Sequence, residues 1–340
     1  MPYFSIITPT YNRATLLVET IKSVLDQTFK DFELIIVDDG STDNTKEAVR
    51  PFLSTRIKYF YQQNKRQGAA RNLGIKNASG EFVAFLDHDD LWSPIFLETY
   101  YKFIQNNPHA QWIHGAFFWF NEYGYWKSKS YPVEGEVWKN LLNGNPICTS
   151  TIVVKSNLLQ NIKFDESIEL GISEDGEFNF RLATITPCYY QPLPLAFMRM
   201  HNTRISNTMH FKNIEKGAFT SLYKILNNPF MNNKPEYLKK RAIAHGYLFV
   251  AENAYGSGLH FKLFIATLKS FISYPPIIFT KRWLSAAIKN FIPSFIGNHI
   301  REFKFKHMVK SNHKTNSINV PLPATLKNEY NNKQNKYLNS

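Results

Sequence analysis

The segment FELIIVDDGSTDNT, residues 32–45, decides the fold class of this 340-residue chain. Its first part, 32–37, is mostly apolar and has the composition of a buried β-strand. The chain then becomes polar at once, and the Ser, Thr and Asp at 41–43 are residue types that favour the N-terminus of a helix. The segment therefore predicts a strand followed by a helix over about 41–53, which is the repeating unit of a parallel α/β sheet.

The rest of the first ninety residues repeats this alternation. Strand-like segments occur at 3–8, 57–61 and 82–86, and helix-like segments occur at 14–25 and 68–80. Strand–helix–strand units cross over with a right hand, so we expect a mostly parallel sheet flanked by helices. In such sheets, ligands bind beyond the carboxyl ends of the strands. After about residue 110 the pattern is less regular.

Acidic residues follow two of the predicted strands. Asp38 and Asp39 come after one strand, and Asp87, Asp89 and Asp90 come after another. Because parallel strands end at one edge of the sheet, the two clusters should share that edge, and like charges repel unless a cation joins them. Mg²⁺ or Mn²⁺ bound to a diphosphate suits a site with few protein carboxylates. A solvated acidic turn is the alternative for the second cluster.

Three further motifs carry side chains suited to chemistry. GAARNLG places Arg71 on a helix where it could pair with phosphate, and SEDGEFNFR places Glu174 and Asp175 at a helix start. A carboxylate in that position can act as a general base. RMHNTRIS contains His201, a candidate metal ligand. Each motif also has an ordinary explanation: a surface Arg, acids in a first helical turn, and a structural His.

The charge of the chain is unevenly divided. Residues 1–200 carry 19 Lys and Arg against 22 Asp and Glu, a net charge of −3, whereas residues 201–340 carry 21 against 5, a net charge of +16. Within the basic half, 259–273 predicts an amphipathic helix, and 281–297 repeats its aromatic and basic character. Such helices could lie in the headgroup layer of an anionic membrane, or they could form a helical subdomain packed against the first domain.

These patterns predict three regions. Residues 1–205 form the α/β domain, and residues 206–310 form a basic, helical region that contacts either a membrane or the acceptor side. Residues 311–340, rich in Asn and Lys, are predicted to be disordered.

Cysteines and apolar segments bear on location. Cys148 and Cys188 cannot form a disulfide framework, and Met1 leads directly into a strand-like segment without a signal-peptide pattern. No apolar run approaches the roughly 18–20 residues that span a bilayer. A cytoplasmic location is predicted, and the basic half leaves open peripheral binding to the inner face of the cell membrane.

Taken in order, SIITPTYNR, LIIVDDGSTDNT, GAARNLG, FLDHDD, ISEDGEFNFRL and RMHNTRIS resemble the motifs of family 2 glycosyltransferases with the GT-A fold, over roughly residues 3–206. The resemblance implies a GT-A domain, followed here by a basic helical extension. It also implies an inverting, Mg²⁺- or Mn²⁺-dependent transfer of a sugar from a nucleotide-diphosphate donor. A UDP-sugar is the expected donor. The implied acceptor is a hydroxyl of a glycan or a lipid-linked sugar, as in the synthesis of bacterial surface polysaccharides.

The resemblance also implies roles for individual residues. Asp175 matches the catalytic base, Asp89 matches the metal ligand, and His201 matches a histidine that completes the metal or diphosphate contacts in some members. The positions expected to bind the nucleotide sugar are Pro9, Tyr11, Asp38, Asp39, Arg71, Asp87 and His88. On the acceptor side we expect Glu174 and, within the loop 144–151, Thr149.

Other functions fit less well. A sugar-phosphate nucleotidyltransferase would need a Gly-rich basic loop after the first strand, but TPTYNRATLL has one Arg and no Gly. A dinucleotide-dependent dehydrogenase would need G-x-G-x-x-G after an early strand, where none occurs. A non-enzymatic binding protein would explain the basic half but not the clustered acids, which repel phosphates, so we expect no nucleic-acid partner. FTKRW, beginning at Phe279, lacks the Gln of the Q-x-x-R-W motif of processive members, so a non-processive enzyme is predicted.

Overall fold

The computed structural model describes residues 1–122, 124–128, 132–171, 173–201, 209–292 and 320–327. Within these residues the strands form one nine-stranded sheet. Its strands are β1 (Phe4–Thr10), β2 (Phe32–Asp38), β3 (Ile57–Tyr61), β4 (Phe82–Phe85), β5 (Leu91–Trp92), β6 (Trp112–Asn121), β7 (Gly124–Lys127), β8 (Val153–Lys155) and β9 (Tyr189–Arg199). The four strands predicted from the alternation lie close to their expected positions.

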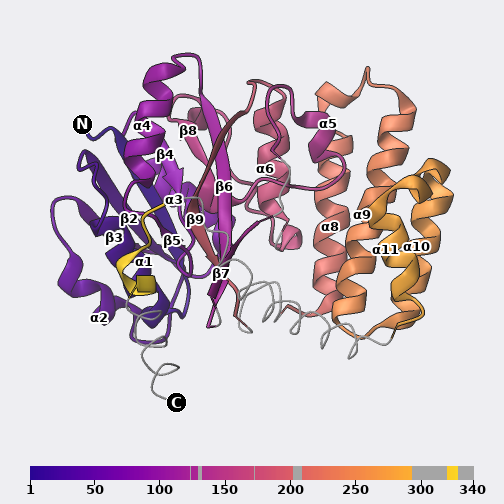
Figure 1. Ribbon diagram of the computed structural model, residues 1–340, viewed down its shortest axis with the longest axis horizontal. Helices are drawn as coiled ribbons and strands as arrows, with labels where there is room; N and C mark the ends of the chain where they lie inside the picture. Colours follow the sequence, from indigo (N-terminus) through magenta and orange to yellow (C-terminus); the bar gives the residue numbers. More distant parts are fainter. Residues whose placement is uncertain (123, 129–131, 172, 202–208, 293–319, 328–340) are drawn as a thin grey trace.

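One half of the sheet is parallel and the other half is mixed (Figure 1). β1 lies between β2 and β4, and β3 lies outside β2, with all four strands parallel. β8 then pairs antiparallel with β4 and β6, β6 and β9 are parallel, and β5 and β7 pair antiparallel with β9 and β6. The predicted α/β fold is therefore confirmed, and the region with less regular sequence forms the mixed half.

Helices cover the faces of this sheet. They are α1 (Ala14–Leu25), α2 (Thr45–Val49), α3 (Arg66–Asn77), α4 (Phe96–Asn106), α5 (Trp138–Leu141) and α6 (Glu174–Ala183), with 3₁₀ helices η1 (Arg50–Phe52), η2 (Thr149–Thr151), η3 (Leu158–Gln160) and η4 (Ile168–Leu170). The helix predicted over 41–53 begins later, at Thr45, because the residues before it contact the other loop of this edge. Ser41 Oγ accepts from the Asn12 N–H at 2.9 Å, and Asp43 Oδ2 accepts from the Ala14 N–H at 3.3 Å.

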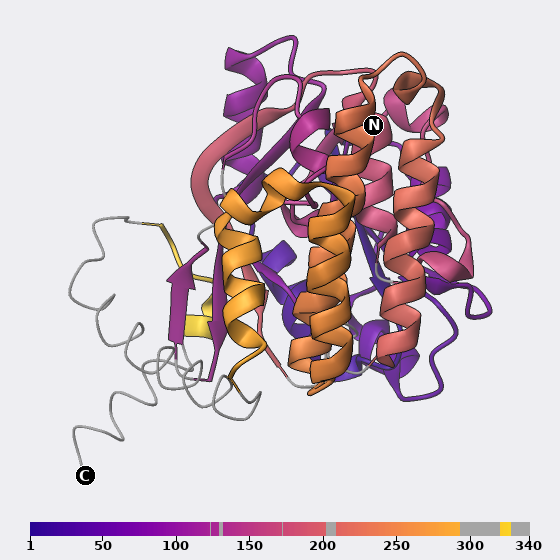
Figure 2. The same cartoon turned by 90° about the vertical axis from the view of Figure 1, so that its right-hand side faces the viewer.

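Helices dominate the described part of the basic half. They are α8 (Phe211–Leu226), α9 (Glu236–Gly256), α10 (His260–Ser273) and α11 (Lys281–Lys289), with η5 (Pro229–Met231) and η6 (Pro275–Phe279). Figure 2 shows them side by side at one end of the sheet. Ile225 and Leu238 are buried in one cluster with Trp138 and Phe180, so this region continues the hydrophobic core of the first domain. Within the described ranges, no helix combines the length and apolarity needed to cross a bilayer.

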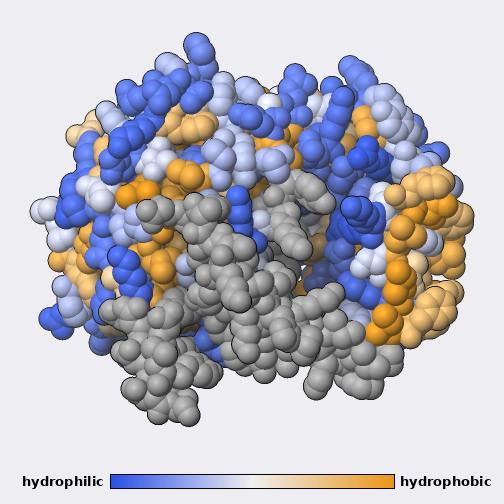
Figure 3. Space-filling model, in the orientation of Figure 1, coloured by the Kyte–Doolittle hydropathy of each residue, from blue (hydrophilic) through white to orange (hydrophobic). Residues whose placement is uncertain are grey.

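The apolar face of α10 points outward. Phe261, Phe264 and Ile272 are 76%, 53% and 67% exposed, whereas Leu263 and Ala266 on the opposite face are buried. Figure 3 shows the resulting apolar surface at the right-hand end of the molecule, over α10 and α11. Helix α10 therefore packs on α9 through Leu263 and smaller residues, and its phenylalanines lie outside the core.

Residues 320–327 pack on the first domain. Leu326 is buried among side chains of β5, β6 and β9, and the Ser93 hydroxyl donates to the Pro321 carbonyl at 2.7 Å. The disorder predicted for 311–340 is therefore wrong for 320–327, because this short segment carries Val320, Leu322 and Leu326, which are enough to anchor it. The rest of the predicted tail lies outside the described residues.

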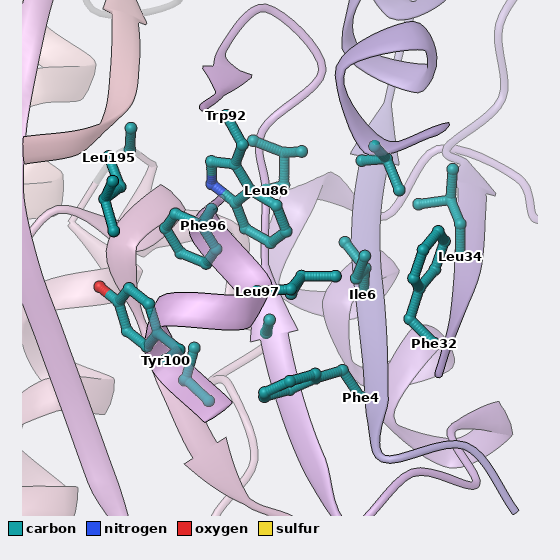
Figure 4. Packing of buried hydrophobic residues seen from close by; sticks show 14 of the residues in the cluster. Phe4, Ile6, Phe32, Leu34, Leu86, Trp92, Phe96, Leu97, Tyr100 and Leu195 are labelled. Atoms are coloured by element: carbon teal, nitrogen blue, oxygen red, sulfur yellow. The ribbon is translucent and has the colours of Figure 1, made fainter. Parts of the chain in front are cut away.

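An aromatic stack in the core supports the sheet edge that carries the acids (Figure 4). Trp92 and Phe96 stack with ring centroids 3.9 Å apart, and Phe96 stacks on Tyr100 at 4.3 Å. The polar ends of this stack hold η2, since Trp92 Nε1 donates to the Ser150 carbonyl and the Tyr100 hydroxyl donates to the Thr151 carbonyl, both at 2.8 Å. These two hydrogen bonds fix the backbone of Ser150 and Thr151 within η2.

Candidate active site

The loop after β2 is held against the loop after β1. Asn12 has φ +51°, a conformation that Asn tolerates better than most residues, and its Oδ1 accepts from the Thr42 N–H at 2.7 Å. Gly40 has φ +85°, and a Cβ at this position would lie 2.8 Å from the backbone nitrogen of Asn64. The DDGSTD sequence therefore builds a fixed loop beside the start of α3, where only glycine fits at its turn.

The two acids of this loop have different environments. Asp38 is 1% exposed and accepts from the Ser41 N–H at 2.7 Å and from the Tyr59 hydroxyl at 2.5 Å, so it supports the loop. The Oδ1 of Asp39 accepts two hydrogen bonds, at 2.7 and 2.8 Å, from the segment 62–65. Its Oδ2 receives no hydrogen bond from the described residues. Of the two residues expected to bind the donor, Asp39 keeps an acceptor for a ligand, and Asp38 is engaged by the protein.

The acidic loop after β4 is fixed from both sides. The Asp87 N–H donates to Ser150 Oγ at 3.1 Å, and Ser150 Oγ donates to Asp90 at 2.7 Å. His88 Nδ1 lies 3.0 Å from the Pro9 carbonyl, which joins this loop to the end of β1. Pro9 and His88, both expected near the donor, are thus brought together. Asp90 is 2% exposed and turns inward, so it serves the loop while Asp87 and Asp89 remain partly exposed.

Arg199, at the end of β9, holds the same acidic loop in place. Its backbone N–H donates to Asp90 Oδ1 and its Nε donates to the Asp89 carbonyl, both at 3.1 Å. A terminal nitrogen donates to Glu19, and the guanidinium lies 4.6 Å from the centre of the Phe120 ring. The sequence placed Arg199 in a motif but assigned it no role. Ser150 carried no signal, because its contacts join residues 58 or more positions apart.

Asp89 and His201 form a pair at the same edge. His201 Nε2 lies 2.9 Å from Asp89 Oδ2, and the two side chains are 18% and 14% exposed. The described residues contain no group of three or more His, Cys, Asp or Glu suited to hold a metal ion. Mg²⁺ and Mn²⁺ are commonly held by one or two protein ligands plus phosphate oxygens, so this pair fits a cation that arrives with a diphosphate. Residues 202–206 of the RMHNTRIS motif lie outside the described residues.

Arg71 joins the acidic loop to helix α6. Its two terminal nitrogens donate to Asp87 Oδ1 and to Glu174 Oε1, each at 2.8 Å, and its side chain is 2% exposed. The guanidinium also lies 5.1 Å from the centre of the Phe164 ring. Both terminal nitrogens donate to carboxylates and Nε has no hydrogen-bond partner among the described residues, so the expected phosphate contact stays a prediction. Arg71 is therefore a positioning residue that ties the two acidic motifs together.

Asp175 lies beside this network at the start of α6. Its Oδ2 accepts from Asn145 Nδ2 at 3.1 Å, and its Oδ1 accepts from the Gly176 N–H at 2.7 Å. Burial, together with the nearby charge of Glu174, raises the pKa of Asp175 to about 7, although Arg71 opposes the shift. A carboxylate with a pKa near 7 is well suited to accept a proton at physiological pH. Asn145 had no role in the sequence analysis.

The expected acceptor-side residues are buried. Glu174 is 3% exposed, and its Oε1 accepts from Arg71 and from Gln67, while its Oε2 has no hydrogen-bond partner among the described residues. Thr149 is 5% exposed within η2. Tyr11, by contrast, is 44% exposed at the end of β1, where a planar ligand could contact it. In the structure Glu174 accepts from Arg71, and Thr149 lies within the helix that supports the acidic loop, so their acceptor-side roles stay predictions.

Replacing Arg71 with Met should destabilise the protein strongly. The substitution keeps much of the side-chain volume but leaves the buried Glu174 carboxylate without its cation, which typically costs about 3–5 kcal/mol of unfolding free energy. The expected fall in Tm is roughly 10 °C. Lys102→Met, which breaks the exposed pair with Glu98, is the control and should change Tm little. Equal Tm values for the two variants would contradict the structural role of Arg71.

The sequence also matches known proteins. The family described as Glycosyl transferase family 2 matches residues 5–160. An uncharacterized glycosyltransferase of Rickettsia typhi is 31% identical over 220 residues, covering 61% of this chain and 67% of that protein. A GalNAc(5)-diNAcBac-PP-undecaprenol β-1,3-glucosyltransferase of Campylobacter jejuni is 51% identical over 94 residues, 26% of this chain and 30% of that protein. The chain spans only 24–28% of the length of three other Rickettsia relatives.

Solved structures show the same fold. TarS of S. aureus, residues 1–349 in complex with UDP-GlcNAc, has a TM-score of 0.61 at 20% identity and covers 84% of this chain and 88% of its own. The mannosyltransferase PcManGT of Pyrobaculum calidifontis, in complex with GDP-Man and Mn²⁺, has a TM-score of 0.52 at 19% identity, covering 86% and 87%. The matched family, the relative covered over two thirds of its length and the shared fold agree. The chain belongs to glycosyl transferase family 2 and has the GT-A fold.

Proposed function

We propose that this glycosyltransferase is metal-dependent and inverting, and that it moves a sugar from a nucleotide-diphosphate donor to an acceptor hydroxyl. UDP-sugars are the first donors that we propose. The observation that carries the proposal is the Arg71 bridge. It connects the strand-end acids, which suit a donor and its cation, to the helix that presents Asp175, which suits a base. Donor and acceptor chemistry therefore meet at one edge of the sheet.

Donor binding is proposed at the loops after β1, β2 and β4. Asp39 keeps a carboxylate oxygen that can accept a hydrogen bond from a nucleobase, and the exposed ring of Tyr11 lies at the end of the neighbouring strand. The two solved relatives are described in complex with UDP-GlcNAc and with GDP-Man. UDP-sugars are the first donors proposed, and GDP-sugars are the next to test.

Asp89 and His201 are the residues proposed to hold Mg²⁺ or Mn²⁺. The pair offers a carboxylate and an imidazole nitrogen, which is an acceptable donor set for Mn²⁺ and, through the carboxylate, for Mg²⁺. When bound, the cation stabilises negative charge on the departing diphosphate. The description of PcManGT with Mn²⁺ supports this assignment.

Asp175 is proposed as the general base. Its carboxylate accepts the proton of the acceptor hydroxyl as that oxygen bonds to the anomeric carbon and the bond from this carbon to the diphosphate oxygen breaks. The nucleoside diphosphate leaves with the bonding electron pair, and the single displacement inverts the anomeric centre. Asn145 and the Gly176 N–H fix the carboxylate for this step.

The acceptor is proposed to be a glycan, most directly a lipid-linked one at the inner face of the cell membrane, and transfer is proposed to be non-processive. The matched Campylobacter relative is named for an undecaprenyl-diphosphate-linked acceptor. FTKRW at the start of α11 lacks the processive Gln, and its Arg282 is engaged with Glu252 at 2.8 Å and with the Asn143 carbonyl.

The proposal is tested with a panel of UDP-, GDP- and dTDP-sugars in Mg²⁺, Mn²⁺ or EDTA. Slow donor hydrolysis, measured as release of the nucleoside diphosphate, needs no knowledge of the acceptor. We expect one sugar nucleotide to be hydrolysed with metal and not with EDTA, and the released sugar to carry the inverted anomeric configuration by NMR. Hydrolysis that persists in EDTA, or a retained configuration, would overturn the mechanism.

Acceptor transfer should depend on pH through Asp175. The base acts when deprotonated, so with saturating donor the kcat/KM for acceptor should rise about tenfold from pH 6 to pH 8, around an apparent pKa near 7. Glu174→Gln should move this limb to lower pH, because the Glu174 charge raises the pKa of Asp175. A rate that does not change between pH 6 and pH 8 would argue against Asp175 as the base.

A further inference from the structure

Exposed apolar side chains concentrate at one end of the molecule. Among the described residues, eighteen large hydrophobic side chains are exposed, and ten of them fall within 259–291. They are Leu259, Phe261, Phe264, Leu268, Phe271, Ile272, Phe279, Leu284, Ile288 and Phe291. Contiguous apolar surface of this kind marks an interaction site in a folded protein. Figure 3 shows it at the right-hand end, away from the strand-end loops.

The helices present this surface systematically. On α10 the exposed apolar residues recur at 261, 264, 268, 271 and 272, which is one helical stripe, and the small buried residues occupy the opposite stripe. On α11 Ala286 faces inward, while Leu284 and Ile288, one turn apart, face outward. The outward stripes are therefore not needed for packing within the described part of the chain.

The charged residues within 259–291 are all basic, and two of them meet acids of neighbouring helices: Lys262 lies 3.9 Å from Glu215, and Arg282 pairs with Glu252 at 2.8 Å. Residues 259–291 contain four Lys and one Arg and no Asp or Glu. Lys262, Lys269 and Lys281 are exposed beside the apolar stripes. Phenylalanines flanked by lysines suit the boundary between headgroups and acyl chains, where the rings enter the bilayer and the ammonium groups meet lipid phosphates. A second copy of this surface would bring like charges together, which disfavours a symmetric dimer at this face.

We propose that the outward face of α10, η6 and α11 is a docking surface for an anionic lipid bilayer. Sequence alone left two readings of these helices, membrane contact or packing on the first domain. Each of these two readings applies to one face of the helices. The inward face packs on the protein, and the outward aromatic face, flanked by lysines, contacts lipid. The inference goes beyond the transfer reaction, because it concerns a surface that binds without donor or acceptor.

Docking at this face would also influence the position of Asp175, the proposed base. Arg282 on α11 donates to both carboxylate oxygens of Glu252 on α9 and to the Asn143 carbonyl, each at 2.8 Å. Two residues further along, Asn145 donates to Asp175. The helix that carries Leu284 and Ile288 is thus hydrogen-bonded to the loop that contacts Asp175.

Vesicle co-sedimentation tests the docking surface. The full chain should bind vesicles of phosphatidylglycerol and phosphatidylethanolamine, and should bind phosphatidylcholine vesicles much more weakly. The triple variant Phe261→Ser, Phe264→Ser, Ile272→Ser should bind the anionic vesicles at least about 100-fold more weakly, because three apolar side chains no longer enter the bilayer. Lys262→Gln with Lys269→Gln should weaken binding about fivefold for each charge removed, and this loss should shrink at high salt.

Ile185→Ser with Leu193→Ser is the matched control, since these residues are 56% and 42% exposed but lie outside the surface. The control should bind vesicles like the wild type, and the triple variant should keep wild-type Tm and donor hydrolysis. Equal vesicle binding by the triple variant and the control would overturn the proposal. The proposal would also fail if ultracentrifugation showed that the wild type is a dimer and the triple variant is a monomer, and if neither protein bound vesicles. If the wild-type protein does not hydrolyse any donor, the transferase mechanism is contradicted. That result would not affect the proposal of a lipid-binding surface.

Discussion

Asp175→Asn is expected to lower acceptor transfer about 10²–10⁴-fold while leaving donor binding unchanged. The amide has the shape of the carboxylate and can still bond to Asn145 and to the Gly176 N–H, but it cannot accept the acceptor proton. Donor affinity should persist because the loops after β1, β2 and β4 are untouched. The rate is measured as sugar transfer at saturating donor, and donor affinity is measured by calorimetry.

Glu177→Gln provides the control on the same helix. Glu177 lies two residues after Asp175, is 5% exposed and pairs with Arg181, so its loss removes a charge from the first turn of α6 without touching the network of the base. It should keep transfer within a few-fold of wild type. If Asp175→Asn and Glu177→Gln transferred sugar equally well, Asp175 would not be the base.

Asp89→Ala is expected to abolish metal-dependent donor use. Removal of the carboxylate leaves His201 alone at the proposed cation site, and the loss of charge stabilisation on the diphosphate should lower kcat/KM for donor hydrolysis about 10³-fold or more. The fold should survive, because the acidic loop is held by Ser150, Asp90 and the backbone carbonyl of residue 89, all of which the variant retains.

Two variants make this result specific. His201→Asn should show a smaller loss with a changed preference between Mg²⁺ and Mn²⁺, since imidazole favours Mn²⁺. Asp31→Ala, which removes an exposed acid away from the edge, should behave like wild type. Near-normal, EDTA-sensitive hydrolysis by Asp89→Ala would place the cation elsewhere.

The parallel half of the fold was predictable because its signals are local. Strand and helix segments up to Phe85 alternate within short windows, and each ends in turn or capping residues. The mixed half was not, because β6, β8 and β9 pair across long sequence separations that no periodicity encodes. Which face of α10 points outward was also not predictable, since an amphipathic pattern shows that a helix has two faces but not which of them packs on the protein.

The site divides in the same way. The two acidic clusters were predicted to share an edge, and they do, because β2 and β4 are both parallel neighbours of β1. The fate of each side chain depended on distant partners: Arg71 reaches Glu174 across 103 positions, and Arg199 reaches Asp89 across 110. Those contacts hold Arg71 and Glu174 together in a buried pair that no sequence pattern predicts, and the phosphate and acceptor contacts expected of these two residues stay predictions. Motifs identify residue types, and the tertiary contacts decide which of their atoms remain for a ligand.

The central claim is that this sheet edge binds a nucleotide sugar together with a divalent cation. The most direct measurement is the thermal shift of the wild-type protein with each UDP-, GDP- and dTDP-sugar, with Mn²⁺ and with EDTA. We predict that one nucleotide sugar raises Tm by several degrees with Mn²⁺ and has little effect in EDTA, as expected when ligand binds only the folded state. An equal shift in EDTA, or no shift with any donor in either condition, would contradict the claim.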